Sequence, residues 1–207
     1  MGTTDDRSRH LVRGMQLAIA SVVVVGLATR NVGVLVNGVL ALGVTVLPGV
    51  LNRDYRLALD PRMTLWITAA VFFHAVGMLG LYDVVWWWDH LTHTLSATLV
   101  AGVGYATARA LDEHSDAVHF PPRFMFVYVL LFTLAFGVVW EVLEFAARGF
   151  AEVAGIDPVL IQYGLRDTVV DLIFDAAGAA LVALFGTGAL SGTIEVLVAR
   201  LARSESE

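Results

Sequence analysis

The sequence contains no cysteine and no lysine among its 207 residues. Without cysteine there is no disulfide, no thiolate metal site and no cysteine nucleophile. All 13 basic residues are therefore arginine, and 19 aspartates and glutamates outnumber them, which gives a formal net charge of −6. We expect no nucleic-acid partner, because an acidic chain lacks the basic surface that binds phosphate backbones.

Charge itself is scarce. Only 15% of the residues are charged and 57% are hydrophobic, with a mean hydropathy of +0.74. A soluble domain of this size is far less apolar. The first apolar run is long and has no small-residue cleavage pattern, so we expect no cleavable signal peptide. The composition therefore predicts an integral membrane protein in contact with membrane lipids.

Apolar runs of membrane-spanning length recur along the chain, and no internal repeat or domain boundary separates them. The sequence predicts an all-α polytopic membrane protein with six transmembrane helices in one bundle, and a single domain over residues 1–207. Residues 193–207 form a cytoplasmic tail, whose first part is either a short amphipathic helix on the membrane surface or an extension of the last span. The predicted spans are 11–29, 32–51, 63–82, 89–111, 124–147 and 167–190.

The arginines indicate the orientation of these spans. When the connections are assigned to alternate sides, Arg30, Arg148 and Arg166 fall on one side, and the other ten of the 13 fall on the side of the termini. Short loops rich in arginine stay in the cytoplasm. We therefore expect a multi-pass protein of the plasma membrane of a prokaryote, with both termini cytoplasmic.

The fourth, fifth and sixth spans carry their ionisable residues at the ends opposite the termini, within about 12 Å of the outer face at about 1.5 Å per residue. A charge at mid-depth costs about 2.5–3.5 kcal/mol, so these side chains are expected to turn inward and meet a partner. The set comprises Asp89, His90 and His93, then Glu141 and Glu144, then Asp167, Asp171 and Asp175, with His74 of the third span at the same depth.

So many carboxylates in a partly dehydrated layer must share protons or be neutralised by a cation. Oxygen ligands with an imidazole suit a divalent ion such as Mg²⁺, Mn²⁺ or Zn²⁺. In this hypothesis the metal ligands are Asp89, His93, Glu144 and Asp171. The catalytic residues are Glu141, as general base, and Arg166, which either pairs with the acids or holds an anion. The other polar site residues are His74, His90, Asp167 and Asp175.

Four stretches resemble an uncharacterised prokaryotic family of six-span inner-membrane proteins of the YjdF type, which is distantly similar to VanZ-like proteins. His90 and Asp175 stand where we expect other residue types in that family. The resemblance implies the six-span fold, the polar positions at His74, Asp89, His93, Glu141, Glu144, Asp167 and Asp171, and an envelope-related role, but no activity. The stretches are Phe73-His74-Ala75, Trp88-Asp89-His90-Leu91-Thr92-His93, Trp140-Glu141-Val142-Leu143-Glu144-Phe145, and Asp167-Thr168 through Asp171 to Gly178-Ala179.

Several functions fit this pattern. The first is a metal-dependent hydrolase or transferase that acts on a lipid-linked or amphiphilic substrate at the outer leaflet. The alternatives are a transporter of protons or small cations, a non-catalytic scaffold for a membrane partner, and a buried polar network that only fixes helix packing. A transporter commonly has a repeat and a site near the midplane, and the sequence has neither. No pattern indicates an oligomeric state.

Two further stretches flank the polar layer. Trp86, Trp87 and Trp88 stand at the outer boundary, where an aromatic belt anchors a membrane protein. The connection over residues 149–166 is longer than a bare turn requires, so we expect it to cover the polar layer, with Asp157 among its contributors.

Overall fold

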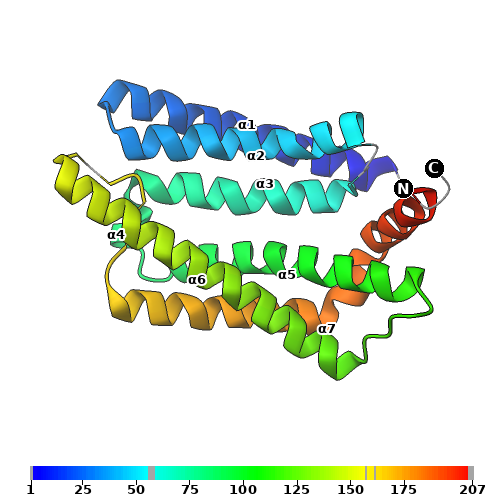
Figure 1. The fold of residues 1–207 in the computed structure, drawn as a ribbon. Coiled ribbons are helices and arrows are strands. Elements are labelled where there is room, and N and C mark those ends of the chain that lie inside the picture. The colour runs from blue at the N-terminus through cyan, green and yellow to red at the C-terminus, as the bar shows by residue number, and fades with distance from the viewer. Residues whose placement is uncertain (1, 56–58, 157, 161, 205–207) are drawn as a thin grey trace.

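The structure, a computed structural model, describes residues 2–55, 59–156, 158–160 and 162–204 (Figure 1). Its regular elements over these residues are all helical, which confirms the all-α prediction. In chain order they are α1 (Gly2–Thr29), α2 (Val32–Tyr55), α3 (Pro61–Val76), the π-helical turn η1 (Gly77–Leu81), α4 (Tyr82–Val84), α5 (Trp88–His114), α6 (Pro122–Ala154) and α7 (Leu165–Ser204).

Five helical segments are long and apolar enough to cross a membrane: Asp6–Thr29, Val32–Asp54, Pro61–Val84, Pro122–Ala154 and Leu165–Arg203. The remaining long helix, α5, has 27 residues and is more polar. At about 1.5 Å per residue it is about 40 Å long, enough to cross. These six long helices make the membrane bundle that the sequence predicts. The two termini lie at the same end of the bundle, as an even number of crossings requires (Figure 1).

The helices form two groups (Figure 1). Helices α1, α2 and α3 pack together around a small core of Ile19, Ala41 and Ala75. Helices α5, α6 and α7 pack around a larger core that includes Ala101, Tyr105, Val129, Val182 and Leu190. Contacts between α3 and α5 join the two groups. Asp89, His93 and Glu144 lie where the groups meet, at the end away from the termini.

Helix α5 is central because its face of small residues allows its neighbours to approach closely. Ala97, Ala101, Gly104 and Ala108 are all buried. A Cβ added to Gly178 of α7 would come within 2.7 Å of the Thr94 carbonyl oxygen on α5. Close approach of this kind is typical of small residues in membrane helices. It fixes α5 and α7 next to each other, which sets the geometry of the polar site.

The third crossing does not end as the straight helix that the sequence predicts over residues 63–82. After Val76 the backbone widens into η1, where Gly80 adopts a φ of 107°. Glycine reaches this left-handed region without steric strain. The turn brings Tyr82 back against α3, and Trp88 donates a hydrogen bond from Nε1 to the Phe73 carbonyl at 3.1 Å. Single π-helical turns occur frequently at functional sites.

Two helices extend beyond the predicted spans. Helix α6 continues to Ala154 and ends at Gly155, whose φ of 67° provides a left-handed cap. Helix α7 bends in its C-terminal part and continues to Ser204, so residues 193–204 are an extension of the last span (Figure 1). Ile194 of this extension is 4% exposed and belongs to the larger core. The last three residues of the predicted tail lie outside the described residues.

Candidate metal site

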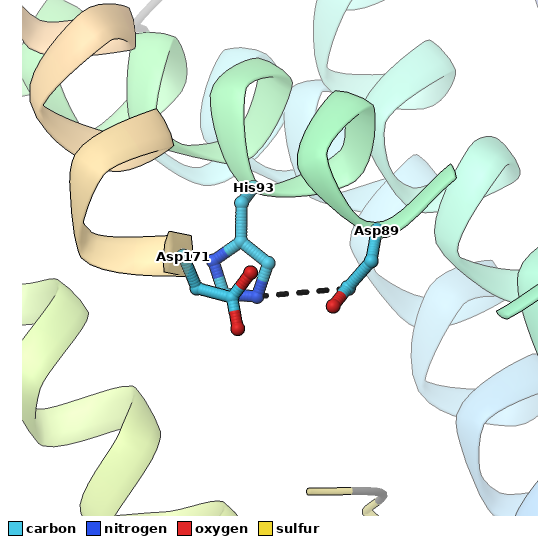
Figure 2. A group of neighbouring side chains, drawn as sticks. All are labelled: Asp89, His93 and Asp171. Atoms are coloured by element: carbon cyan, nitrogen blue, oxygen red, sulfur yellow. Dashed lines mark ion pairs between the residues drawn. The ribbon is translucent and has the colours of Figure 1, made fainter. Parts of the chain in front are cut away.

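Three ligand groups converge at the end of the bundle opposite the termini (Figure 2). Asp89 and His93 lie one turn apart near the start of α5, and Asp171 comes from the second turn of α7. One ligand atom from each residue lies within 4.8 Å of those of the other two. We call these three residues the ligand cluster. A helical i, i+4 pair faced by a carboxylate from a neighbouring helix can hold a single ion.

The ring of His93 is oriented by a second carboxylate. Its Nδ1 lies 3.3 Å from Asp175 Oδ1, and its Nε2 lies 3.8 Å from Asp89 Oδ1. Only the first distance is a hydrogen bond, so in the neutral imidazole Nδ1–H donates to Asp175. The lone pair of Nε2 then points into the ligand cluster. A carboxylate that holds the far nitrogen of a histidine is the usual support of a metal-ligating imidazole.

Asp171 is the most deeply buried member of the ligand cluster, with 1% of its surface exposed. Its Oδ1 has no hydrogen-bond partner among the described residues. A buried carboxylate without partners is strongly unfavourable, because it has lost its hydration and gained nothing in return. A cation between Asp171, Asp89 and His93 would supply the missing interaction. The donor set, two carboxylates and one imidazole, fits Mg²⁺, Mn²⁺ or Zn²⁺.

The two glutamates of α6 do not face the same space. Glu144 lines a cavity between the two helix groups and accepts a hydrogen bond from Trp140 Nε1 at 2.9 Å. Glu141 faces α7, where its Oε2 accepts a hydrogen bond from the Thr168 hydroxyl at 2.7 Å, and its Oε1 has no partner among the described residues. Residues three apart differ by about 60° around a helix, enough to place them on two sides of α6. Neither belongs to the ligand cluster.

His74 belongs to a different network. Its Nε2 lies 3.0 Å from Asn37 Oδ1 on α2, and its Nδ1 lies 2.8 Å from the Tyr82 hydroxyl. The Asn37 amide donates to the carbonyls of Gly33 and Val159, so its oxygen is the acceptor for the Nε2–H of His74. Nδ1 then accepts from Tyr82. Both ring nitrogens are occupied by neutral groups, which leaves no lone pair for a metal.

The remaining predicted site residues surround the ligand cluster without joining it. His90 stacks on Phe174 with ring centroids 4.4 Å apart, and its Nδ1 has no partner among the described residues. Asp167 accepts a hydrogen bond from the Tyr163 backbone N–H at 3.0 Å, which holds the start of α7. Arg166 is exposed, and the described part of the chain gives it no hydrogen bond or ion pair.

A cavity of about 530 Å³ opens beside the ligand cluster. Asp89, His93, Glu144 and Asp175 line its polar end, and side chains of α2, α3, α5 and α6 line the rest. Its volume lies within the roughly 300–1,000 Å³ that is usual for small-molecule sites. Two of the three residues of the ligand cluster, Asp89 and His93, face this space.

The connection between α6 and α7 covers one end of this cavity. Leu160 and Tyr163 line the cavity, and the Val159 carbonyl accepts the hydrogen bond from Asn37. Tyr163 also donates from its hydroxyl to Asp83 at 2.7 Å. Asp157 lies outside the described residues.

Sequence reasoning missed Asn37, Tyr82 and Thr168. Asn37 could have been found, because a lone amide in an apolar span is expected to bond a neighbouring helix. Tyr82 and Thr168 carry no such signal, since a tyrosine near the membrane boundary and a threonine at a helix start are common.

Over residues 11–192 the chain matches a family described as Predicted membrane protein (DUF2238). A protein of Thermotoga maritima, described as uncharacterized, is 28% identical over 137 residues, which make up 63% of this chain and 65% of that relative. The match therefore spans less than two thirds of the relative's length. No solved structure matches the chain.

Proposed function

The chain belongs to the DUF2238 family of predicted membrane proteins, and from that premise we propose that it is a metal-dependent membrane enzyme. In this proposal it is a hydrolase or transferase that acts on a lipid-linked or amphiphilic substrate, and Asp89, His93 and Asp171 hold one Mg²⁺, Mn²⁺ or Zn²⁺ ion. By the arginine distribution the site lies at the outer leaflet of the plasma membrane and both termini are cytoplasmic. The YjdF-type and VanZ-like resemblance stays a prediction, and the proposal does not depend on it.

The observation that carries the proposal is the carboxylate of Asp171. It is 1% exposed, has an oxygen without a partner among the described residues, and lies with Asp89 and His93 in one group of ligand atoms. A charge that only fixed helix packing would be expected to have its own hydrogen bonds. Ionisable residues inside a membrane are functional by default. A cation is therefore the partner that we infer.

Asp89, His93 and Asp171 would hold the ion with three protein ligands, the number that is usual in catalytic sites. A bound divalent ion lowers the pKa of water and polarises a scissile group. Asp175 would keep His93 in the tautomer that ligates through Nε2. Glu144 lines the cavity, so we give it the role of general base that the sequence predicts for Glu141. Glu141 would instead hold Thr168 and thereby the start of α7.

Transport of protons or cations receives less support. The buried ionisable side chains, such as His93, Glu144 and Asp171, gather at one end of the bundle. The α5–α7 contact towards the termini instead contains buried Ala101, Val182 and Leu190. Packed apolar side chains are a barrier to ions, because they offer no replacement for hydration. Impermeable vesicles are the result expected from the enzyme proposal.

The decisive experiment is elemental analysis of the detergent-purified chain, followed by titration of the metal-stripped protein with Mg²⁺, Mn²⁺ and Zn²⁺. The native chain is expected to bind one ion. Asp171→Asn, which has nearly the same shape, is expected to lose it. The matched control is Asp116→Asn, because Asp116 is an exposed aspartate in the turn after α5. This control should bind metal as the native chain does.

Full metal binding by a folded Asp171→Asn protein would overturn the metal site. A native chain that binds none of the three ions, even when they are supplied in excess, would favour a scaffold or a shared-proton network instead. Circular dichroism and size-exclusion profiles that match the native chain keep either result from being a folding artefact.

A further inference from the structure

The cavity beside the ligand cluster is charged at one end and mostly apolar along the rest, where Ser96 and Thr133 are the polar side chains of its α5 and α6 walls. On α5 its wall passes from Asp89 and His93 to Leu99 and Val100. On α6 it passes from Glu144 to Phe136 in the same direction. Two helices thus present the same gradient from charge to hydrocarbon. Such a gradient matches a molecule with a polar head and an apolar chain.

The length of the cavity corresponds to one leaflet. From Asp89 to Val100 the α5 wall rises about 16 Å, at about 1.5 Å per residue. The hydrocarbon core of a bilayer is about 30 Å thick, so one leaflet contributes about 15 Å. Since Asp89 lies near the membrane boundary and Val100 near mid-depth, an acyl chain in the cavity would keep the depth that it has in the bilayer.

The cavity opens sideways towards the lipid. Leu40 and Val44 of α2 and Phe136 of α6 line it, yet they are 61%, 36% and 51% exposed. Helix α2 packs on α1 and α3, whereas α6 packs on α5 and α7 and crosses them obliquely (Figure 1). The two cavity walls therefore belong to different helix groups. An acyl chain can enter between α2 and α6 without crossing the polar end.

We propose that this cavity binds an acyl chain of a bilayer phospholipid, which enters between α2 and α6 and brings the headgroup to the ligand cluster. The inference rests on the proposed function for the fate of the headgroup, since an anionic phosphate or ester oxygen next to Asp89, Glu144 and Asp175 requires a cation between them. Binding of the chain itself depends only on the apolar walls. The phospholipid is therefore the substrate class of the proposed enzyme.

The test uses the full chain in phosphatidylcholine vesicles that contain a phosphatidylcholine with a photoreactive group in the middle of one acyl chain. After illumination, mass spectrometry maps the labelled residues. Label is expected on Leu99 and Val100, which line the cavity, in addition to Val103, which is 65% exposed on the same helix and reports ordinary surrounding lipid. Label on Val103 without label on Leu99 or Val100 would overturn the proposal.

Two variants of α2 form a matched pair. Val44→Trp places an indole in the cavity wall and is expected to abolish the label on Leu99 and Val100 while keeping that on Val103. Val46→Trp adds the same group at a position that is 56% exposed and does not line the cavity, and should leave all labels unchanged. Equal labelling of the cavity wall in both variants would also overturn the proposal.

The proposal that the site binds a metal and the proposal that the cavity binds an acyl chain can fail separately. In Asp171→Asn the acyl chain is still expected to label Leu99 and Val100, and Val44→Trp is still expected to bind the metal. Loss of chain labelling in Asp171→Asn would contradict the independence of the apolar walls. A parallel arm with a photoreactive polyprenyl phosphate distinguishes lipid classes: labelling of the cavity wall by the polyprenyl chain alone would overturn the phospholipid assignment.

Discussion

His74 and His93 lie on neighbouring helices at the same end of the bundle, yet their surroundings differ in one decisive way. His74 contacts two neutral groups, the Asn37 amide and the Tyr82 hydroxyl, and each ring nitrogen has its own partner. His93 donates to Asp175 and turns its other nitrogen towards carboxylates, one of which has an oxygen without a partner in the described chain. The hydrogen bonds of the His74 ring are complete, whereas the network of His93 includes a carboxylate oxygen whose missing interaction a bound cation would supply.

The same substitution at the two histidines tests this difference most strongly. His93→Phe removes a ligand and is expected to weaken metal binding by more than about 100-fold, since loss of a supporting partner alone already costs about 10–100-fold. His74→Phe should bind metal as the native chain does. The affinities are measured by titration of metal-stripped protein in detergent. Equal losses in both variants would remove the distinction between the two histidines.

Asp175→Asn is expected to have an intermediate effect. The amide can still contact His93 Nδ1, but it no longer carries the charge that favours the Nδ1–H tautomer. Metal affinity should fall by about 10–100-fold, which is the usual effect of removing the partner of a ligating histidine. The bound ion should keep the native coordination number in X-ray absorption spectra. Unchanged affinity would show that Asp175 does not support the site.

Loss of the His74 hydrogen bonds should lower the stability of the protein and leave metal binding unchanged. His74→Phe leaves Asn37 Oδ1 without a partner and removes the 2.8 Å hydrogen bond of the Tyr82 hydroxyl, which keeps only its 3.4 Å contact with Thr92 Oγ1. An unsatisfied buried group costs about 1–3 kcal/mol. We expect a lower free energy of unfolding in detergent. Restoring an apolar contact with the double variant Asn37→Leu, His74→Phe should recover part of the loss. A single variant as stable as the native chain would mean that this network contributes little.

The smallest effect is expected at the connection that covers the cavity. Partial burial, and then the hydrogen bond to Asp83, raise the pKa of Tyr163 above its usual range. Because the folded state binds this proton more tightly, the stabilisation is complete below the unfolded pKa of about 10 and is lost as the pH rises above it.

Tyr163→Phe should therefore destabilise the chain by about 0.5–1.5 kcal/mol at neutral pH, the usual contribution of one hydrogen bond. The difference from the native chain should shrink above about pH 10, where the unfolded tyrosine ionises. Thermal unfolding in detergent across this pH range measures both. A difference that grows with pH would contradict the sign of the pKa shift.

The spacing of residues along single helices was enough to predict which residues could form part of the candidate site. Asp89 and His93 are one turn apart whatever the rest of the chain does, and Asp171 stands at the matching depth of its own span. Spacing was not enough for Glu141 and Glu144: they are only three residues apart, yet Glu141 contacts α7 and Glu144 faces the cavity. His74 was predicted at the right depth, but its partner Asn37 comes from a helix that carries no charge near it.

By itself the sequence determined that this is a membrane protein, because its apolar runs are long enough to cross a bilayer. It also determined how far each polar residue lies along its span, because a helix rises by a fixed distance per residue. Only the tertiary structure decided which of those groups meet. The rotation of each helix about its axis depends on close contacts such as Gly178 against Thr94, and the fold of Tyr82 over His74 depends on the turn at Gly80. The hydropathy of the sequence predicts neither the rotation of the helices nor the position of Tyr82, because both depend on packing between residues of different segments.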